Sequence, residues 1–362
     1  MPDEHLIPQS VDTFANAVAA LAASVGLNRD FTAEPLFGGA NNRVFRLNTN
    51  HQRTLLKAYF RHPADTRDRL TAEFSFLRFA WNHGLRCIPE PLAFDAPNAL
   101  GLYRFIDGRR PEPNEIRQSE IDLAAAFFVE LNRHRYASDA ASLSPASEAC
   151  FSIEDHVHQV DRRVRRLQTE TFTFSGNAHV VRFVRADLPE AWERTKVAVR
   201  EQVDSLCLSY ERRLTSDEKC LSPSDFGFHN ALQLPDGGLC FVDFEYAGWD
   251  DPAKMICDFF CQPAVPAPQA WHGHFAKSVV AGFAAREELL QRVQILLPLY
   301  RIKWCCIVLN GLLPEGRARR EFAGAATTIS AEQQLRTLER ANSLLQQATP
   351  AAAEHLNALL TP

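Results

Sequence analysis

The spacing of hydrophobic residues changes along the first hundred positions of the chain. Residues 10–26 carry apolar side chains at helical spacing and end at Gly26, which predicts a packing helix. A second helical pattern covers residues 68–81. The remaining apolar runs are short, are separated by turn residues and predict five strands. These strands fall within residues 36–47 (strand, turn, strand), 54–59, 88–92 and 100–106.

From residue 107 onwards the pattern is mainly helical. Residues 121–131 and 185–215 have helical spacing, and so does the chain from residue 268 to its end, where we expect breaks at Pro298 and Pro314. A chain of 362 residues also exceeds the size at which one core usually stops growing. We therefore predict an α+β fold with a small antiparallel-sheet lobe and a mainly helical lobe. The predicted lobes are residues 1–106 and 107–362.

Residues 222–245 contain the side chains that most clearly indicate a chemical function. Two apolar runs flank the turn Pro-Asp-Gly-Gly, which predicts a tight hairpin because Asp-Gly accepts the positive φ of such turns. The hairpin brings its ends together, so Asn230 and Asp243 should lie side by side, with Asp225 on the adjoining loop. Carboxylate and amide oxygens suit Mg²⁺, whose shell is usually completed by phosphate oxygens and water.

The spacing Asp-x4-Asn, followed by the hairpin and by Asp-Phe-Glu, resembles the catalytic and metal loops of the protein-kinase-like fold. It resembles most the aminoglycoside phosphotransferase and choline kinase branch. Asp-x4-Asn alone is equally compatible with a loop carboxylate and a capping asparagine, so the hairpin and the upstream residues decide. The resemblance implies a two-lobed kinase-like fold that binds ATP and Mg²⁺. It makes Asp225 the catalytic residue, which orients the acceptor hydroxyl and accepts its proton, and it makes Asn230 and Asp243 the metal ligands.

One lysine of the predicted third strand supports this resemblance. Lys57 stands among apolar residues, and a buried ammonium needs a counter-charge or a phosphate. Its candidate partner is Glu73 on the helix of residues 68–81. In the kinase-like arrangement such a lysine holds the α- and β-phosphates and the glutamate holds the lysine. The alternative is that the two residues are unrelated surface charges.

The resemblance also implies two backbone sites for the nucleotide. The turn that contains Gly38, Gly39 and Asn42 would let its N–H groups approach the phosphates, although an ordinary hairpin turn fits the same residues. Backbone groups of Phe105 or Ile106, in the hinge between the lobes, would bind adenine. The sequence does not determine which of these two residues does so.

The chain departs from the family pattern before the catalytic aspartate. The family has His-Gly-Asp, whereas this chain has Pro223, Ser224 and Asp225. The missing histidine mainly braces the catalytic loop, so its loss affects loop geometry more than chemistry. His229 cannot replace it by position, and we expect a structural role for it. Glu245 is expected either to contact a metal-bound water or to be a surface carboxylate.

Four charged residues downstream are expected not to take part in the reaction. By resemblance, Asp251 and Asp258 are structural candidates, one of which caps the helix that braces the site. Arg301 and Lys303 could face an acceptor pocket in the C-terminal part. A surface role is the simpler expectation for both.

Composition narrows the possible partners and compartments. A net charge of −5 and a pI near 6.2 do not favour nucleic-acid binding. Nine cysteines without a Cys-x2-Cys spacing indicate reduced thiols in a cytoplasmic protein. The first residues lack the basic start and apolar core of a signal peptide. The longest apolar run, residues 304–313, is shorter than the roughly 20 residues that span a bilayer, so we expect no membrane segment.

The leading hypothesis is an ATP- and Mg²⁺-dependent phosphotransferase that acts on a hydroxyl of a small molecule, such as a sugar, amino sugar or amino alcohol. The alternative, suggested by the missing histidine, is a kinase-like regulatory protein that binds nucleotide without phosphotransfer. A protein kinase is disfavoured by Asp-Phe-Glu and by the absence of a recognisable Ala-Pro-Glu segment. The sequence leaves open the acceptor, ATP versus GTP, and the oligomeric state.

Overall fold

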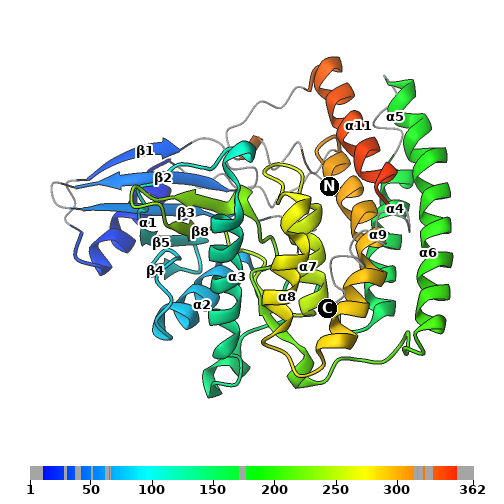
Figure 1. Cartoon of the computed structure of the whole chain (residues 1–362). Helices are drawn as coiled ribbons and strands as arrows, with labels where there is room; N and C mark the ends of the chain where they lie inside the picture. Colours follow the sequence, from blue (N-terminus) through cyan, green and yellow to red (C-terminus); the bar gives the residue numbers. More distant parts are fainter. Residues whose placement is uncertain are drawn as a thin grey trace.

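A five-stranded antiparallel sheet lies at one end of the molecule, and a larger group of helices forms the other end (Figure 1). This arrangement confirms the predicted α+β class. The computed structural model describes residues 11–27, 31–36, 42–49, 52–61, 65, 67–170, 177–313, 316, 321–322 and 329–348.

The sheet has the strand order β1-β2-β3-β5-β4, so β3 is its central strand. Lys57 of β3 lies opposite Val44 on one neighbour and Gly101 on the other. A residue in the middle of the sheet is therefore fixed by pairing on both sides. The strands are β1 (Thr32–Leu36), β2 (Arg43–Asn48), β3 (Arg53–Ala58), β4 (Pro91–Asp95) and β5 (Leu100–Arg104).

Two helices, α1 (Val11–Ser24) and α2 (Arg69–Asn82), cover the sheet. Leu56 packs in a cluster with residues of α1, whereas Tyr103 belongs to the core that contains α2 and continues into the helical part. The two clusters place α1 and α2 on opposite faces. The face that carries α2 is consequently the one joined to the rest of the molecule.

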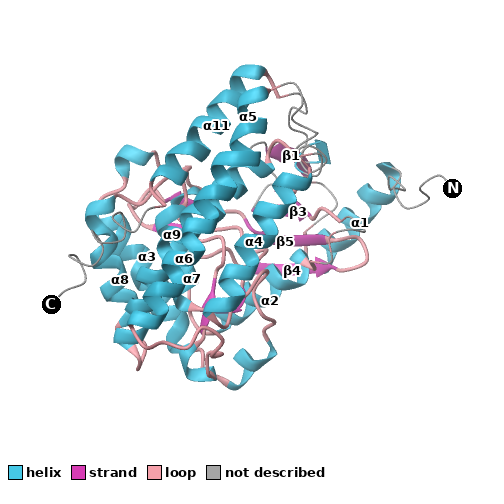
Figure 2. Ribbon diagram, turned by 90° about the vertical axis from the view of Figure 1, so that its right-hand side faces the viewer, coloured by secondary structure: helices cyan, strands magenta, loops and turns pink. Residues whose placement is uncertain are grey.

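Helix α9 (Arg286–Asn310) is the centre of the helical part and packs against α4, α6, α7, α8 and α11 (Figures 1 and 2). The break predicted at Pro298 is wrong, because this proline lies inside α9. An interior proline costs about 3 kcal/mol, and packing against five helices outweighs that cost. Pro314 lies outside the described residues. The other helices are α3 (Gln118–Arg133), α4 (Ile153–Thr169), α5 (Ala178–Arg182), α6 (Leu188–Ser205), α7 (Pro252–Cys261), α8 (His272–Val280) and α11 (Ala331–Gln346).

Burial explains the apolar composition of α9. Within the described residues it is the one helix whose length and composition would suit a membrane span, and 72% of its most apolar window is buried inside the protein. Tyr300 and Cys305 are completely buried. The helix therefore lies within the hydrophobic core of the helical part.

Two small two-stranded sheets flank the loops that carry the candidate site residues. The predicted hairpin is confirmed: β7 (Ala231–Gln233) pairs with β8 (Leu239–Phe241), and Gly237 in the turn has a φ of 87°. The second sheet pairs β6 (Cys220–Ser222) with β9 (Gly248–Asp250). The loop between β6 and β7 contains Asp225, and the loop between β8 and β9 contains Asp243.

Candidate active site

The hairpin brings the predicted metal ligands together. The backbone N–H of Val242 donates to the carbonyl of Asn230 at 2.9 Å, so Asn230 and Asp243 leave the hairpin at the same end. The side chain of Asn230 then donates to the backbone carbonyl of Asp225 at 2.9 Å and to its carboxylate at 3.3 Å. Ser224 and Asp243 have φ values of 66° and 69°, a conformation unusual for residues other than glycine and often found at functional sites.

Lys57 joins three parts of the chain at this point. Its ammonium lies 2.7 Å from Glu73 on α2 and 2.8 Å from Asp243 after β8. Burial acts to lower the pKa of Lys57, but Asp243 and Glu73 raise it well above its ordinary value. Burial acts to raise the pKa of Asp243, and the Lys57 ammonium brings it below its ordinary value. Both groups of the Lys57 to Asp243 pair are therefore charged at neutral pH.

Glu73 is held from two further directions. The hydroxyl of Tyr59 donates to its Oε2 at 2.6 Å, and the backbone N–H of Phe244 approaches its Oε1 at 3.3 Å. The Tyr59 hydroxyl is in turn 2.7 Å from that of Tyr103. The carboxylate of Glu73 is only 4% exposed. It is thus a fixed support for Lys57 rather than a mobile surface charge.

Glu245 is not a surface carboxylate. Its side chain is 1% exposed, accepts a hydrogen bond from Asn42 at 2.5 Å and lies 3.7 Å from the guanidinium of Arg69. Asn42 also accepts from the backbone N–H of Phe60 at 3.3 Å. These contacts join the base of the proposed phosphate turn to the loop after β8. Gly38 and Gly39 of that turn lie outside the described residues.

The hinge backbone is partly engaged within the protein. The N–H of Phe105 donates to the carbonyl of Arg53 at 3.3 Å, so this N–H is not the group that would bind adenine. The guanidinium groups of Arg46 and Arg53 lie 5.6 and 5.2 Å from the centre of the Phe105 ring. The carbonyl of Phe105 and the backbone of Ile106 are the candidates that remain.

The structure brings His229 to the candidate catalytic residue. Its Nε2 lies 3.1 Å from Oδ1 of Asp225, because the short helical turn Phe228–Asn230 reverses the chain towards the loop. Our expectation of a purely structural role did not include this contact. The spacing of four residues does not indicate this contact, because residues 225–227 are not helical and the short turn begins only at Phe228.

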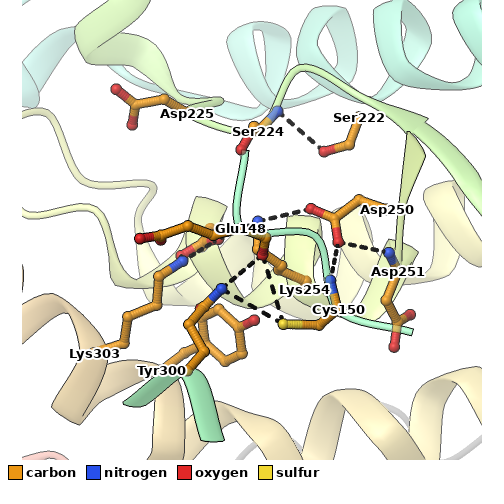
Figure 3. A network of polar contacts seen from close by, with 12 residues as sticks. Glu148, Cys150, Ser222, Ser224, Asp225, Asp250, Asp251, Lys254, Tyr300 and Lys303 are labelled. Carbon is orange, nitrogen blue, oxygen red and sulfur yellow. Dashed lines mark hydrogen bonds and ion pairs between the residues drawn. The ribbon is translucent and has the colours of Figure 1, made fainter. Parts of the chain in front are cut away.

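A buried network of ion pairs supports the strand before Asp225 (Figure 3). Asp250 of β9, which pairs with Cys220 of β6, binds the ammonium of Lys254 at 2.8 Å. Lys254 is 3.4 Å from Asp258, which also binds Lys303 at 2.8 and 2.9 Å. The surface role expected for Lys303 is therefore wrong, since its side chain is 6% exposed. β6 ends at Ser222, so this network anchors the start of the loop that carries Asp225.

Asp251 has the expected capping role. Its side chain accepts from the backbone N–H of Ala253 at 2.8 Å at the start of α7. The same carboxylate binds Arg292 at 3.0 Å and His156 at 3.2 Å. Burial acts to raise the pKa of Asp251, but Arg292 and then His156 lower it below its ordinary value.

The oxygen donors of the site suit Mg²⁺ held together with phosphate. The carboxylate of Asp243 is 39% exposed, and the side-chain nitrogen of Asn230 faces Asp225, which leaves its amide oxygen for a cation. Among the described residues no group of three or more His, Cys, Asp or Glu side chains forms a metal site. Mg²⁺ in phosphate-transferring enzymes is usually bound by one or two protein oxygens and the phosphates, so this donor set fits it.

Comparison with known proteins agrees with this geometry. A profile of the phosphotransferase enzyme family matches residues 32–292. The chain belongs to the phosphotransferase enzyme family. It is accordingly an enzyme of the small-molecule phosphotransferase class, with the two-lobed protein-kinase-like fold. No curated protein matches the sequence significantly.

Three solved structures illustrate the fold of this phosphotransferase. A choline/ethanolamine kinase family protein from Mesorhizobium loti has a TM-score of 0.58 and 19% identity, over 96% of this chain and 98% of the other. Choline kinase from Streptococcus pneumoniae has a TM-score of 0.55 and 13% identity, over 92% and 99%. A spectinomycin phosphotransferase in complex with ADP and spectinomycin has a TM-score of 0.54 and 12% identity, over 92% and 98%. At these identities the likeness concerns the fold.

Proposed function

We propose that this phosphotransferase transfers the γ-phosphoryl group of ATP, with Mg²⁺, to a hydroxyl group of a small molecule. A sugar, an amino sugar or an amino alcohol is the proposed acceptor class. The observation that carries the proposal is the position of Lys57, bound to Glu73 and Asp243 next to the loop of Asp225. A buried lysine between these carboxylates is suited to receive the phosphates of a nucleotide.

Each residue has a distinct role in the proposed reaction. The ammonium of Lys57 would bind the α- and β-phosphates, and Glu73 would hold it there. The carboxylate of Asp243 and the amide oxygen of Asn230 would hold Mg²⁺, which when bound neutralises phosphate charge. Asp225 would orient the acceptor hydroxyl and accept its proton. The acceptor oxygen forms the new bond to the γ-phosphorus, the bond to the bridging oxygen breaks, and ADP leaves with that electron pair.

The relatives' names support the acceptor class without fixing the acceptor. The solved structures include proteins named for choline or ethanolamine and for spectinomycin. The small molecules in these names all carry hydroxyl groups but differ in the rest of their structures. We therefore propose the class and leave the compound to experiment.

A screen for ATP consumption tests the proposal. The purified protein is incubated with Mg²⁺, ATP and a panel of sugars, amino sugars and amino alcohols, and ADP release is measured. We expect acceptor-dependent ADP release that is lost in Asp225→Asn. Calorimetric binding of Mg·ATP without turnover on any acceptor would favour a regulatory protein, and absence of both would overturn the proposal.

A further inference from the structure

The carboxylate of Asp225 is contacted by two neighbouring side chains. Nε2 of His229 lies 3.1 Å from Oδ1, and the amide nitrogen of Asn230 lies 3.3 Å from Oδ2. A carboxylate is only an acceptor of hydrogen bonds, so Nε2 of His229 carries the hydrogen in this contact. Asp225 is 35% exposed and His229 is 17% exposed, so the contact lies at the edge of the site.

Close packing places the ring of His229. Gly227 has an extended backbone with a φ of 165°, which any residue can adopt. A Cβ atom built at this position would nevertheless lie 2.9 Å from Nδ1 and 3.2 Å from Cε1 of His229. The ring thus occupies the space that a side chain at residue 227 would fill.

The other ring nitrogen of His229 makes no hydrogen bond within the described residues. This nitrogen, Nδ1, is buried. A buried polar atom without a hydrogen-bond partner destabilises the fold, so this position of the ring has a free-energy cost. Its hydrogen bond to Asp225 is the polar contact that the arrangement provides.

The residue that precedes Asp225 by two positions cannot provide such a contact. Pro223 has no side-chain donor, and its carbonyl accepts the backbone N–H of Asp225 at 3.0 Å in a tight turn. Ser224 within that turn has a φ of 66°. The turn fixes the backbone of Asp225 but leaves the rotation of its carboxylate to the side chains around it.

We propose that His229 is a positioning residue that holds the carboxylate of Asp225 in the orientation required to accept the acceptor's proton. The inference rests on the proposed function, because it assigns Asp225 the proton-accepting role. The proton passes from the hydroxyl to Asp225, and His229 keeps its own. His229 thereby supplies from the far side of the loop the brace that Pro223 does not supply.

Two substitutions at residue 229 test the donor position. In His229→Gln the amide nitrogen can reach the place of Nε2, whereas in His229→Asn it reaches only the place of Nδ1. Losing a hydrogen bond to a charged group lowers a rate by about 10- to 150-fold. We expect His229→Asn to lower kcat by about that factor and His229→Gln to restore it to within about 5-fold of wild type. The KM for ATP should stay within about 2-fold in both, because neither touches Lys57.

Gly227→Ala tests the same contact without changing the histidine. Its added methyl group displaces the ring, so kcat should fall about as far as in His229→Asn, again with little change in KM for ATP. His158→Asn, an exposed histidine on α4, is the matched control and should leave both constants within about 2-fold. Circular dichroism of each variant checks that the fold persists.

The outcomes separate the two proposals. A wild-type enzyme that transfers phosphate, with His229→Asn unchanged in kcat, overturns the positioning role alone. Equal losses in His229→Gln and His229→Asn also overturn it, because packing rather than the donor would then matter. A wild-type protein that transfers no phosphate to any acceptor and hydrolyses no ATP overturns the proposed function, and the role of His229 with it.

Discussion

Replacing Glu73 by glutamine should weaken nucleotide binding by removing the support of Lys57. Oε2 of Glu73 accepts from Lys57 at 2.7 Å and from Tyr59 at 2.6 Å, while Oε1 faces the backbone N–H of Phe244. Glutamine has nearly the same shape but offers one oxygen and one NH₂ group. If its oxygen faces Lys57 and Tyr59, its NH₂ group meets another donor at Phe244. The substitution therefore removes a charge and one acceptor without creating a cavity.

The size of the effect follows from the lost charge-assisted hydrogen bond. Such a bond contributes about 1.5–3 kcal/mol, which corresponds to about 10- to 150-fold in a dissociation constant. Asp243, 2.8 Å from the ammonium, remains and would draw Lys57 towards the proposed metal ligands and away from the proposed position of the phosphates. We therefore expect the Kd for Mg·ATP to rise by at least about 10-fold in Glu73→Gln.

Isothermal calorimetry with Mg·ATP measures this effect without a known acceptor. Glu90→Gln is the matched control, because Glu90 pairs with Arg104 of β5 at 2.9 Å but both side chains are partly exposed. Its Kd should change by less than about 2-fold. A Kd for Glu73→Gln within about 3-fold of wild type would refute the idea that Glu73 positions Lys57 for the nucleotide. Equal losses in both variants would point to general weakening of the sheet instead.

Two further predictions concern stability. Lys303→Met removes one partner of the buried Asp258, and breaking such a pair costs about 3–5 kcal/mol. Because Lys254 stays 3.4 Å from Asp258, we expect the free energy of unfolding in urea to fall by about 3 kcal/mol. A fall of less than about 1 kcal/mol would contradict the stabilising role of the network. Asp251→Asn keeps the cap of α7 but removes the charge that binds Arg292. Burial opposes ionisation of Asp251, yet Arg292 lowers its pKa in the folded state, so its stabilising effect is complete above about pH 4 and is lost as the pH falls further. The stability difference between wild type and Asp251→Asn should thus shrink below about pH 4, and a constant difference from pH 7 to pH 3 would contradict this account.

Local patterns were sufficient to predict much of the fold and part of the site. The hairpin between Asn230 and Asp243 depends on a turn sequence and two short apolar runs, all within one segment. The contact between Lys57 and Glu73 could also be anticipated, because a lysine in a central strand needs a counter-charge and the next helix offered one. These inferences use the period of each element and the cost of burying a charge.

The remaining features depend on what distant segments bring to one place. Lys303 is buried because Asp258 of α7 lies against α9, which no spacing within α9 indicates. Pro298 stays inside that helix because five others pack on it. Glu245 is buried against Asn42, 203 positions away just before β2, and against Arg69 of α2. In each case tertiary packing, rather than local preference, determines the environment of the residue.

Transfer of labelled phosphate by wild type and Asp225→Asn is the most direct test of the central claim. The acceptor found by screening is incubated with γ-labelled ATP and Mg²⁺, and labelled product is counted while the Kd for Mg·ATP is measured in parallel. A positioned general base contributes about 10²- to 10⁴-fold to a rate. We predict that Asp225→Asn loses transfer by about that factor and keeps its Kd within about 3-fold. Undiminished transfer by Asp225→Asn would contradict the account.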